Sequence, residues 1–388
     1  MNAEHFYLEF RKKFGESEDK ARMYFSPGRV NIIGEHLDYN GGYVLPFALA
    51  LGTYLLVRRR NDRLIKLASQ QFNSTIEVDL ENILMRNANE WWNYPLGVIS
   101  GFRKLTEVDH GFEMLFTGDL PIGVGLSSSA SIEIATAFAL NDLFQTNLSA
   151  HELALLSVKA ENEFVGVQCG ILDQFAAVFG KEDHALFLNC ATEDFVYVPI
   201  LSQDYLFIIS DTNKPRRLTT SFFNERHREC GLALKTMQRL LNVSHLADAL
   251  PKQFEMIEHW FADENTRKRA RHVVFENERV KKAAAALADA NIAELAQLMN
   301  ASHASLRDNY EVSCDELEAI VNSARSVDGC LASRISGAGF GGCAINLVRR
   351  DAIEKFRQQV TTAYFETTGL NATFYNSQSS NGAGEMHF

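Results

Sequence analysis

The sequence of 388 residues is longer than one hydrophobic core usually supports, so two domains are expected. A composition that is 46% hydrophobic and 22% charged is typical of a soluble globular protein. The net charge of −11 argues against a general nucleic-acid binder or a binder of anionic membranes, and any anionic substrate must be held by local positive groups.

The N-terminus is mixed and charged, without a signal-peptide pattern, and no apolar run reaches the roughly 18 residues that a membrane span needs. The six cysteines are scattered and form no Cys-x-x-Cys pair, which argues against a zinc site or a disulfide framework. We therefore expect a cytoplasmic enzyme with reduced cysteines and no membrane or nucleic-acid partner.

Residues 23–49 place polar side chains in an otherwise strand-like pattern. Arg29, Glu35, His36 and Asp38 lie in a stretch bracketed by glycines. So many hydrogen-bonding side chains in one turn favour a cradle for a polar ligand, and a surface hairpin with solvated charges is the alternative. His36 and Asp38 have the spacing of two metal ligands, but no third ligand is recognisable, so a metal site is not favoured here.

Short strands are expected at residues 53–60, 64–67 and 75–78, followed by a helix that begins near Trp91 and Tyr94. The aromatic side chains at its start suit stacking on a flat base. Packing in the core is the commoner use of tryptophan and tyrosine, and both interpretations stay open.

The segment 112–140 reads as a strand, a glycine- and serine-rich loop at 123–129, and a helix from 130. Glycines allow close backbone approach, and the first N–H groups of a helix attract an anion, so this order suits a phosphate. The alternative is a glycine-rich turn with serine caps. The loop is neither a Walker A motif nor a dinucleotide fingerprint, because the required lysine and third glycine are absent.

Two carboxylates follow in apolar surroundings. Ser149 begins a capping box and a helix expected to run to about Gly166, with Glu161 beside its apolar face. Asp173 is either the N-cap of a helix that starts at Gln174 or a shielded carboxylate with a tuned proton affinity.

We place a domain boundary near Ser202, giving domains 1–202 and 203–388. The second domain is rich in expected helices, at residues 218–241, 267–287, 292–307, 314–326 and 351–367. The glycine-rich run that starts at Ser336 contains G-x-G-x-x-G, but an apolar strand follows it rather than precedes it, so a dinucleotide unit is discarded in favour of a tight packing loop.

Five segments in this order resemble the superfamily of small-molecule kinases named after galactokinase, homoserine kinase, mevalonate kinase and phosphomevalonate kinase. Residues 27–42, PGRVNIIGEHLDYNGG, are similar to its galactokinase signature. The other segments read LPIGVGLSSSAS, CGILDQF, MNASHASLRDNYEVS and SGAGFGGCA, so the resemblance covers nearly the whole chain. It implies an α+β fold of two domains, an N-terminal domain with a left-handed crossover and a ferredoxin-like C-terminal domain, with the site between them.

The resemblance also implies a function: ATP-dependent phosphorylation of the anomeric C1 hydroxyl of galactose to galactose 1-phosphate, the first committed step of galactose catabolism. Separately, we expect a monomer. The implied catalytic pair is Arg29 and Asp173. The implied sugar-binding residues are Glu35, His36, Leu37, Asp38, Gly170 and Phe223. The implied ATP-binding residues are Ser69, Trp91, Gly123, Val124, Gly125, Leu126, Ser127, Ser128 and Ser129. The implied Mg²⁺ ligands are Ser129 and Glu161.

The chemistry of these residues agrees with phosphoryl transfer, which needs an oriented nucleophile, a metal on the phosphates and compensation of charge. Two positions depart from the family pattern: Leu37 replaces a threonine, and Phe223 replaces a sugar-contacting tyrosine, a loss of about 0.5–1.5 kcal/mol for one hydrogen bond. A kinase for a related sugar such as N-acetylgalactosamine is therefore one alternative. A non-catalytic sensor of sugar and ATP is another, disfavoured because Arg29, Asp173 and the serine loop are intact.

Overall fold

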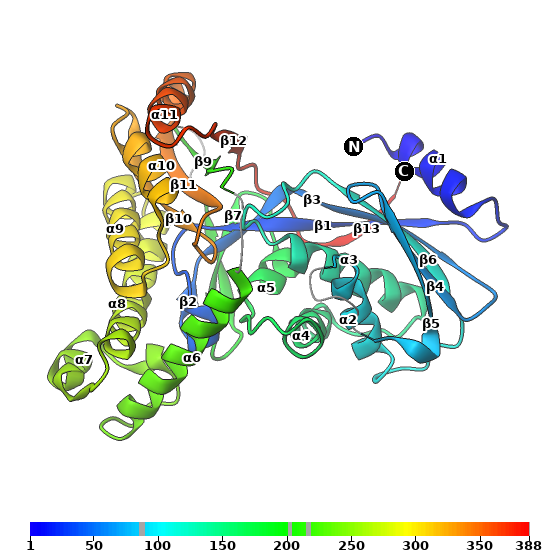
Figure 1. The fold of residues 1–388 in the computed structure, drawn as a ribbon, viewed down its shortest axis with the longest axis horizontal. Coiled ribbons are helices and arrows are strands. Elements are labelled where there is room, and N and C mark those ends of the chain that lie inside the picture. Colours follow the sequence, from blue (N-terminus) through cyan, green and yellow to red (C-terminus); the bar gives the residue numbers. More distant parts are fainter. Residues whose placement is uncertain (85–89, 201–203, 215–218, 388) are drawn as a thin grey trace.

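A six-stranded sheet forms the framework of the first half of the chain (Figure 1). This computed structural model describes residues 1–84, 90–200, 204–214 and 219–387. The sheet has the order β13-β1-β3-β6-β4-β5; β4 and β6 pair in parallel and the other neighbours are antiparallel. Its strands are β1 Arg22–Asn31, β3 Pro46–Arg59, β4 Leu64–Ser69, β5 Ser74–Asp79, β6 Phe112–Gly118 and β13 Gly384–Met386.

Both faces of this sheet are covered by helices, as the alternation of its side chains requires. Tyr24 and Leu55 face a cluster formed with the inner helices, whereas their neighbours Met23 and Leu56 face Phe10 of α1 (Ala3–Phe14). The inner helices lie below the sheet in Figure 1. They are α2 Asn93–Phe102, α3 Ser128–Leu143, α4 Ala150–Ala160 and α5 Leu172–Phe179. A small sheet of β2 Tyr43–Val44, β7 His184–Asn189 and β8 Phe195–Pro199 adjoins them.

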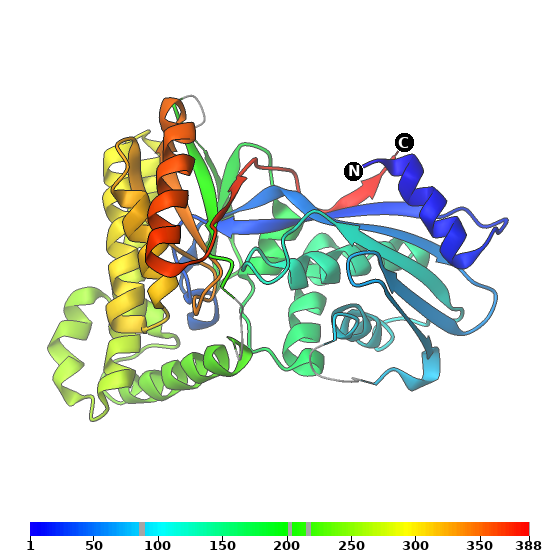
Figure 2. The ribbon, with the colours of Figure 1, turned by 45° about the horizontal axis from the view of Figure 1, so that its top comes forward.

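The second half carries a four-stranded antiparallel sheet in the order β10-β11-β9-β12. Numbered along the chain, this is the order 2-3-1-4 of a ferredoxin-like sheet, with helices after its first and third strands. The strands are β9 Tyr205–Asp211, β10 Cys330–Ser336, β11 Cys343–Arg349 and β12 Thr373–Asn376. The helices are α6 Thr219–Gln238, α7 Pro251–Ile257, α8 Glu264–Ala288, α9 Ile292–Ser305, α10 Asp315–Arg325 and α11 Ile353–Thr368; α8 to α11 stand at the left of Figure 2, and α6 runs along the bottom.

Three local expectations need correction. Helix α5 begins at Leu172, so Asp173 lies in its first turn and is not its N-cap. Helix α4 has the predicted capping box at Ser149, but it ends at Ala160, and a π-helical turn carries the chain on to Val165. A strand, β10, precedes the C-terminal glycine loop after all. The dinucleotide unit is still excluded, because the loop joins two antiparallel strands and no helix opens on it.

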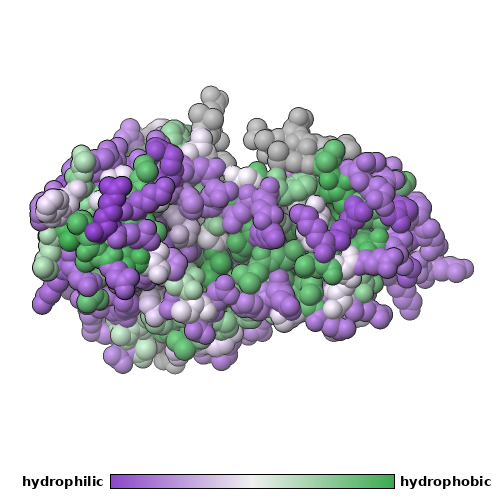
Figure 3. Space-filling model, turned by 90° about the horizontal axis from the view of Figure 1, so that it is seen from below, coloured by the Kyte–Doolittle hydropathy of each residue, from purple (hydrophilic) through white to green (hydrophobic). Residues whose placement is uncertain are grey.

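The predicted boundary at Ser202 falls outside the described residues. The last strand, β13, returns to the first sheet and pairs with β1. No helix in the ranges described above is long and apolar enough to cross a bilayer. The surface is mostly polar, with apolar residues gathered near the middle of the face that Figure 3 shows.

Candidate active site

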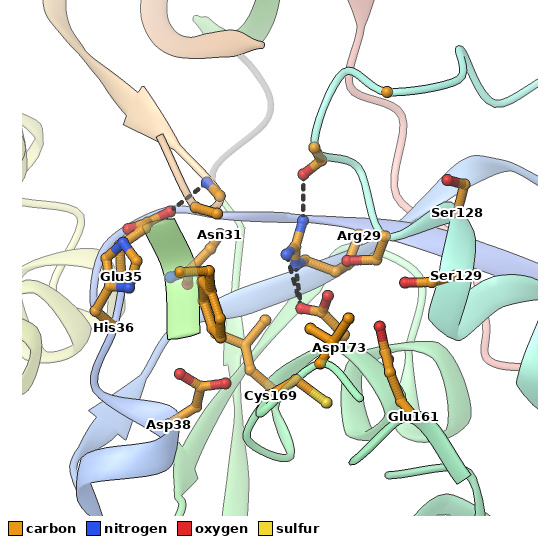
Figure 4. Close-up of a pocket in the computed structure, with 18 of the residues that line it drawn as sticks. Arg29, Asn31, Glu35, His36, Asp38, Ser128, Ser129, Glu161, Cys169 and Asp173 are labelled. Carbon is orange, nitrogen blue, oxygen red and sulfur yellow. Dashed lines mark hydrogen bonds and ion pairs between the residues drawn. The ribbon is translucent and has the colours of Figure 1, made fainter. Parts of the chain in front are cut away.

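A cavity of about 250 Å³ lies where loops of the two sheets meet. Figure 4 shows its residues: Glu35 and His36 lie on one side, Arg29 and Asp173 at the centre, and Ser129 on the other side. The predicted residues on its wall are Arg29, Glu35, His36, Asp38, Gly123, Gly125, Ser127, Ser128, Ser129, Glu161, Asp173 and Phe223. The structure thus brings together segments that are far apart in the sequence.

Arg29 and Asp173 form an ion pair at the centre of the cavity. Arg29 comes from β1, and its Nε and Nη2 lie 2.8 and 2.7 Å from the same carboxylate oxygen, Oδ1 of Asp173. A third bond, from Nη1 to the carbonyl of Gly125 at 2.6 Å, ties Arg29 to the glycine loop. Arg29 is buried, whereas Asp173 keeps a quarter of its side chain exposed. The pair therefore offers a fixed cation and an accessible carboxylate to a ligand.

The glycine and serine loop has the conformation that a phosphate cradle needs. Gly123 and Gly125 have φ of 77° and 96°, and Ser127 also adopts a left-handed φ of 61° before α3 begins at Ser128. No side chain caps α3, and the hydroxyl of Ser127 is buried without a hydrogen bond. The first N–H groups of α3 are therefore open to an anion, which the helix dipole favours.

The C-terminal glycine loop closes over this cradle. A Cβ atom on Gly337 would come within 3.0 Å of the carbonyl of Gly125, so glycine allows the two loops to meet. Gly337 and Ala338 lie on the cavity wall, which explains the tight packing loop expected from the sequence. Their role could not be found from local pattern alone, because the partner loop is distant in the chain.

Asp38 lies on the cavity wall, and Gly170, which is not a wall residue, contacts its carboxylate. The backbone N–H of Gly170 donates to Oδ2 of Asp38 at 3.1 Å, and a Cβ atom at this glycine would come within 2.5 Å of that oxygen. Burial, with the nearby charge of Asp173, raises the pKa of Asp38 to about 7. A ligand that donates hydroxyl hydrogen bonds would stabilise the charged form of Asp38.

Glu35 is a buried carboxylate on the cavity wall with a protein partner of its own. Arg334 from β10 forms an ion pair with it, and the backbone N–H of Gly337 donates to Oε1 at 3.1 Å. Burial raises the pKa of Glu35, and Arg334 opposes that rise. The sequence did not single out Arg334, because nothing in a strand residue marks a partner about three hundred positions away.

His36 completes this side with an aromatic neighbour. Its ring lies 5.7 Å from that of Phe223 on α6, and both residues line the cavity. Burial lowers the pKa of His36 to about 3, so the ring is neutral at physiological pH. An apolar ring beside polar groups is a common way to bind a sugar.

Ser129 and Glu161 face one another beside Asp173 (Figure 4). Glu161 is 5% exposed, and burial with the charge of Asp173 raises its pKa to about 7. Gln174 donates to its Oε2 at 2.8 Å. A hydroxyl and a carboxylate are the oxygen donors that Mg²⁺ takes alongside phosphates and water, and a cation here would relieve the cost of burying that carboxylate. The residues present fit the ion.

The remaining predicted residues do not line the cavity. Leu37, Val124 and Leu126 are buried in the hydrophobic core. Trp91 is also buried, and its Nε1 donates to the hydroxyl of Ser74 at 2.8 Å. Ser69 is buried at the end of β4. Wall residues outside the predicted site set are Asn31, Tyr94, Val167, Cys169, Leu172, Gly337 and Ala338.

Family comparisons match three parts of the chain. Residues 8–59 match the galactokinase galactose-binding signature, residues 93–181 the N-terminal domain of the GHMP kinases, and residues 283–367 the C-terminal domain of the GHMP kinases. These matches cover β1 and its loop, the glycine and serine loop with α3 to α5, and the part of the second half that holds α9, α10, β10 and β11 with nearly all of α11.

Whole-chain relatives agree. The chain is 43% identical over 387 residues to a galactokinase of Fusobacterium nucleatum, covering 99% of each, and 44% identical over 380 residues to one of Bacillus subtilis, covering 97% of each. It superposes on the crystal structure of Lactococcus lactis galactokinase complexed with galactose with a TM-score of 0.96, 42% identity and 99% coverage of both chains. This likeness confirms the predicted α+β fold of two domains. The chain is a member of the galactokinase family of the GHMP kinases.

Proposed function

We propose that this enzyme transfers the γ-phosphoryl group of ATP to the C1 hydroxyl of galactose. The observation that carries the proposal is the position of the Arg29–Asp173 pair. It lies between the Glu35, His36 and Asp38 side of the cavity, which suits a sugar, and the loop at residues 123–129, which suits phosphates. A hydroxyl and a phosphate bound on these two sides would meet at the pair.

Asp173 acts as the base and Arg29 as its partner. Both arginine contacts fall on Oδ1, so Oδ2 is available to accept the proton of the C1 hydroxyl as the new O–P bond forms and the bond to the β-phosphate oxygen breaks. ADP leaves with the electron pair of the broken bond. Arg29 stabilises negative charge at the centre of the site, and a positioned base contributes roughly 10²–10⁴-fold.

Asp38 and Gly170, with His36 and Phe223, hold the sugar, and Glu35 supports this loop through Arg334 and Gly337. Leu37 supports the loop from the core side. Galactose is favoured over a related sugar because the chain carries the galactose-binding signature over residues 8–59.

ATP binds with its phosphates in the loop from Gly123 to Ser129. Ser129 and Glu161 hold Mg²⁺, which neutralises charge on the phosphates when bound. Val124 and Leu126 anchor the loop in the core. We place the adenine near Ser69 and Trp91, where the Trp91 ring stacks parallel to that of Phe72, a residue with 45% exposure.

We also propose a domain division, an assembly state and a compartment for this enzyme. We divide the chain at residues 202 and 203, because β9 just beyond belongs to the second sheet. We propose a monomer, because one chain supplies both sides of the cavity. We propose a cytoplasmic enzyme, supported by six free cysteines, which suit a reducing compartment.

The test is a product analysis. Purified protein is incubated with ATP, Mg²⁺ and a panel of galactose, N-acetylgalactosamine, glucose and 2-deoxygalactose, and the phosphorylated carbon is assigned by ³¹P and ¹H NMR. We expect phosphate on C1 of galactose and the highest kcat/KM for galactose. A higher kcat/KM for N-acetylgalactosamine would establish the related-sugar kinase instead, and the absence of transfer to any sugar would favour a sensor.

A further inference from the structure

A chain of hydrogen-bonding side chains runs from the sugar side of the cavity into the C-terminal domain, through the partly buried Tyr39 and the buried His36, Tyr310 and Cys230. Nδ1 of His36 lies 2.8 Å from the hydroxyl of Tyr39, which lies 2.9 Å from the hydroxyl of Tyr310. That hydroxyl lies 3.0 Å from Sγ of Cys230. This series of hydrogen bonds joins the loop after β1 to α6 and to the turn that follows α9.

All four groups are neutral near pH 7. Burial raises the pKa values of Tyr39 and Tyr310 well above their usual range and that of Cys230 to about 11, and it lowers that of His36 to about 3. A neutral imidazole has one N–H donor and one acceptor nitrogen. The three hydrogen bonds can therefore all point from Cys230 toward His36 or all point from His36 toward Cys230. The direction decides which nitrogen of His36 carries the proton.

The groups at the two ends of the chain favour one direction. The imidazole nitrogen of His36 is a good acceptor, whereas a thiol sulfur is a weak one. The side-chain amide of Asn40 can donate to the sulfur of Cys230, so the direction in which the S–H donates to Tyr310 satisfies both groups. Tyr310 then donates to Tyr39, and Tyr39 donates to Nδ1 of His36.

The proton of His36 is consequently on Nε2, the nitrogen that no side chain holds. Nε2 is buried without a hydrogen bond of full geometry, and the nearby carbonyl of Ala338 favours a proton on the ring. Two contacts hold the His36 ring in place. The backbone of His36 is left-handed, with φ of 63°, and Nδ2 of Asn40 donates to the His36 carbonyl at 2.8 Å. The Tyr310 ring also packs against the His36 ring, with 4.5 Å between the ring centroids.

We propose that Tyr310 and Cys230 are positioning residues for sugar recognition. They hold His36 in the form with hydrogen on Nε2, so that His36 donates a hydrogen bond to a sugar oxygen and does not accept one from a sugar hydroxyl. The proposal rests on the proposed function, because it takes this side of the cavity as the sugar site. It assigns a role in substrate selection to two residues of the C-terminal half that do not line the cavity.

The first experiment reads the ring directly, without ligand. Protein labelled with ¹⁵N-histidine is studied by long-range ¹H–¹⁵N NMR, and the His36 signal is identified by its loss in His36→Gln. We expect a protonated Nε2 and an unprotonated Nδ1 in the wild type, and a substantial shift of the proton to Nδ1 in Tyr310→Phe. A wild-type proton on Nδ1, or no change in Tyr310→Phe, would overturn the proposal.

Tyr364→Phe is the matched control. Tyr364 is also fully buried in the C-terminal half, and it donates one hydrogen bond, to the carbonyl of Thr212 at 2.8 Å. Both variants should lower Tm to a similar extent. Only Tyr310→Phe should raise the KM for galactose, by about 3- to 10-fold, the effect of one weakened hydrogen bond, while the KM for ATP and kcat change less than twofold. An equal rise in both variants would mean a structural role only.

A second pair of variants covers the case in which Tyr310→Phe does not fold. Cys230→Ser keeps a donor at the start of the chain and Cys230→Ala removes it, so the serine variant should keep the wild-type tautomer and the alanine variant should lose it. Identical spectra from these two variants would overturn the proposal. Because the spectra need no sugar, a protein that is inactive on galactose but has the expected tautomers contradicts the proposed function alone.

Discussion

Arg334 of β10 and Glu35 of the loop after β1 form a buried ion pair that joins the two domains at the side of the cavity where we propose that the sugar binds. Arg334 also donates from Nη1 to the carbonyls of Asn31 and Ile32 at 3.2 and 3.1 Å. One arginine of the second sheet thus fixes the path of the loop that carries the side chains proposed to bind galactose.

Replacing Arg334 should therefore cost more than a surface charge would. In Arg334→Met the carboxylate of Glu35 stays buried without its partner, and the free energy of unfolding should fall by about 3–5 kcal/mol. Urea unfolding at pH 7 measures this loss. The double variant Glu35→Gln/Arg334→Met should recover part of it, because no unpaired charge remains. A loss below about 1 kcal/mol in the single variant would contradict the assignment.

Asp173→Asn should nearly abolish turnover while sugar binding survives. Asparagine keeps the shape and the contact with Arg29 but cannot accept the hydroxyl proton, so kcat should fall roughly 10²–10⁴-fold. Calorimetry should give a galactose Kd within about tenfold of the wild type. Asp142→Asn is the control, because Asp142 also pairs with an arginine, Arg22 at 3.2 Å, but lies elsewhere. A variant with more than a tenth of the wild-type kcat would exclude Asp173 as the base.

Glu161→Gln and Ser129→Ala should each raise the Mg²⁺ concentration needed for half-maximal activity, because each removes or weakens an oxygen ligand. Magnesium titrations at fixed ATP measure the shift. Glu163→Gln provides the control, since Glu163 lies two positions away with its side chain 58% exposed. If both test variants keep the wild-type titration curve, the ion is held elsewhere.

Asp38→Asn should stabilise the free protein above pH 7 and weaken galactose binding. The pKa of Asp38 is raised from 3.8 to about 7. The native state therefore keeps a proton that the unfolded state releases, and stability falls as pH rises between these two values. The variant has no carboxyl group here and does not lose this stability as the pH rises. Its free energy of unfolding should exceed that of the wild type by nearly zero at pH 4 and by about 1–2 kcal/mol at pH 8. The difference is moderate because the Asp38 side chain is partly exposed. Thermal unfolding of both proteins across this pH range measures the difference in stability. A stabilising effect of Asp38→Asn that grows toward low pH would refute the prediction.

Phe223→Tyr should tighten galactose binding by restoring the hydroxyl that the family usually has here. The gain in KM should be at most about tenfold, because a net hydrogen bond is worth roughly 1 kcal/mol. Turnover should change less, since the contact helps the ground state and the transition state alike. The kcat/KM values for galactose and N-acetylgalactosamine are compared in both proteins. A lower value for galactose in the tyrosine variant, together with a faster reaction of another sugar in the wild type, would show that galactose is not the native substrate.

The sequence allowed prediction of features whose causes are local. The loop from Gly123 to Ser129 and the cap at Ser149 are set by neighbouring residues, and the structure has both. Motif resemblance located most of the cavity wall, because those motifs follow the chain through the site.

Features that depend on distant partners could not be predicted. Arg334, the partner of Glu35, lies about three hundred residues away in the sequence. Asp173 forms an ion pair with Arg29 and does not cap the helix in which it lies. Leu37 and Val124 lie within polar motifs, yet their side chains pack into the core. Which way a side chain points is decided by packing between elements, and a motif does not record it.

The strand β13 has a consequence for how the protein is made. Met386 pairs with Met23, so the N-terminal sheet is completed by residues that are synthesised long after its other strands. Until β13 is synthesised, the outer edge of β1 is an unpaired strand edge, the kind of surface that invites aggregation. A nascent chain of this enzyme therefore carries an open sheet edge on the strand that holds Arg29 until β13 has been made and can close it.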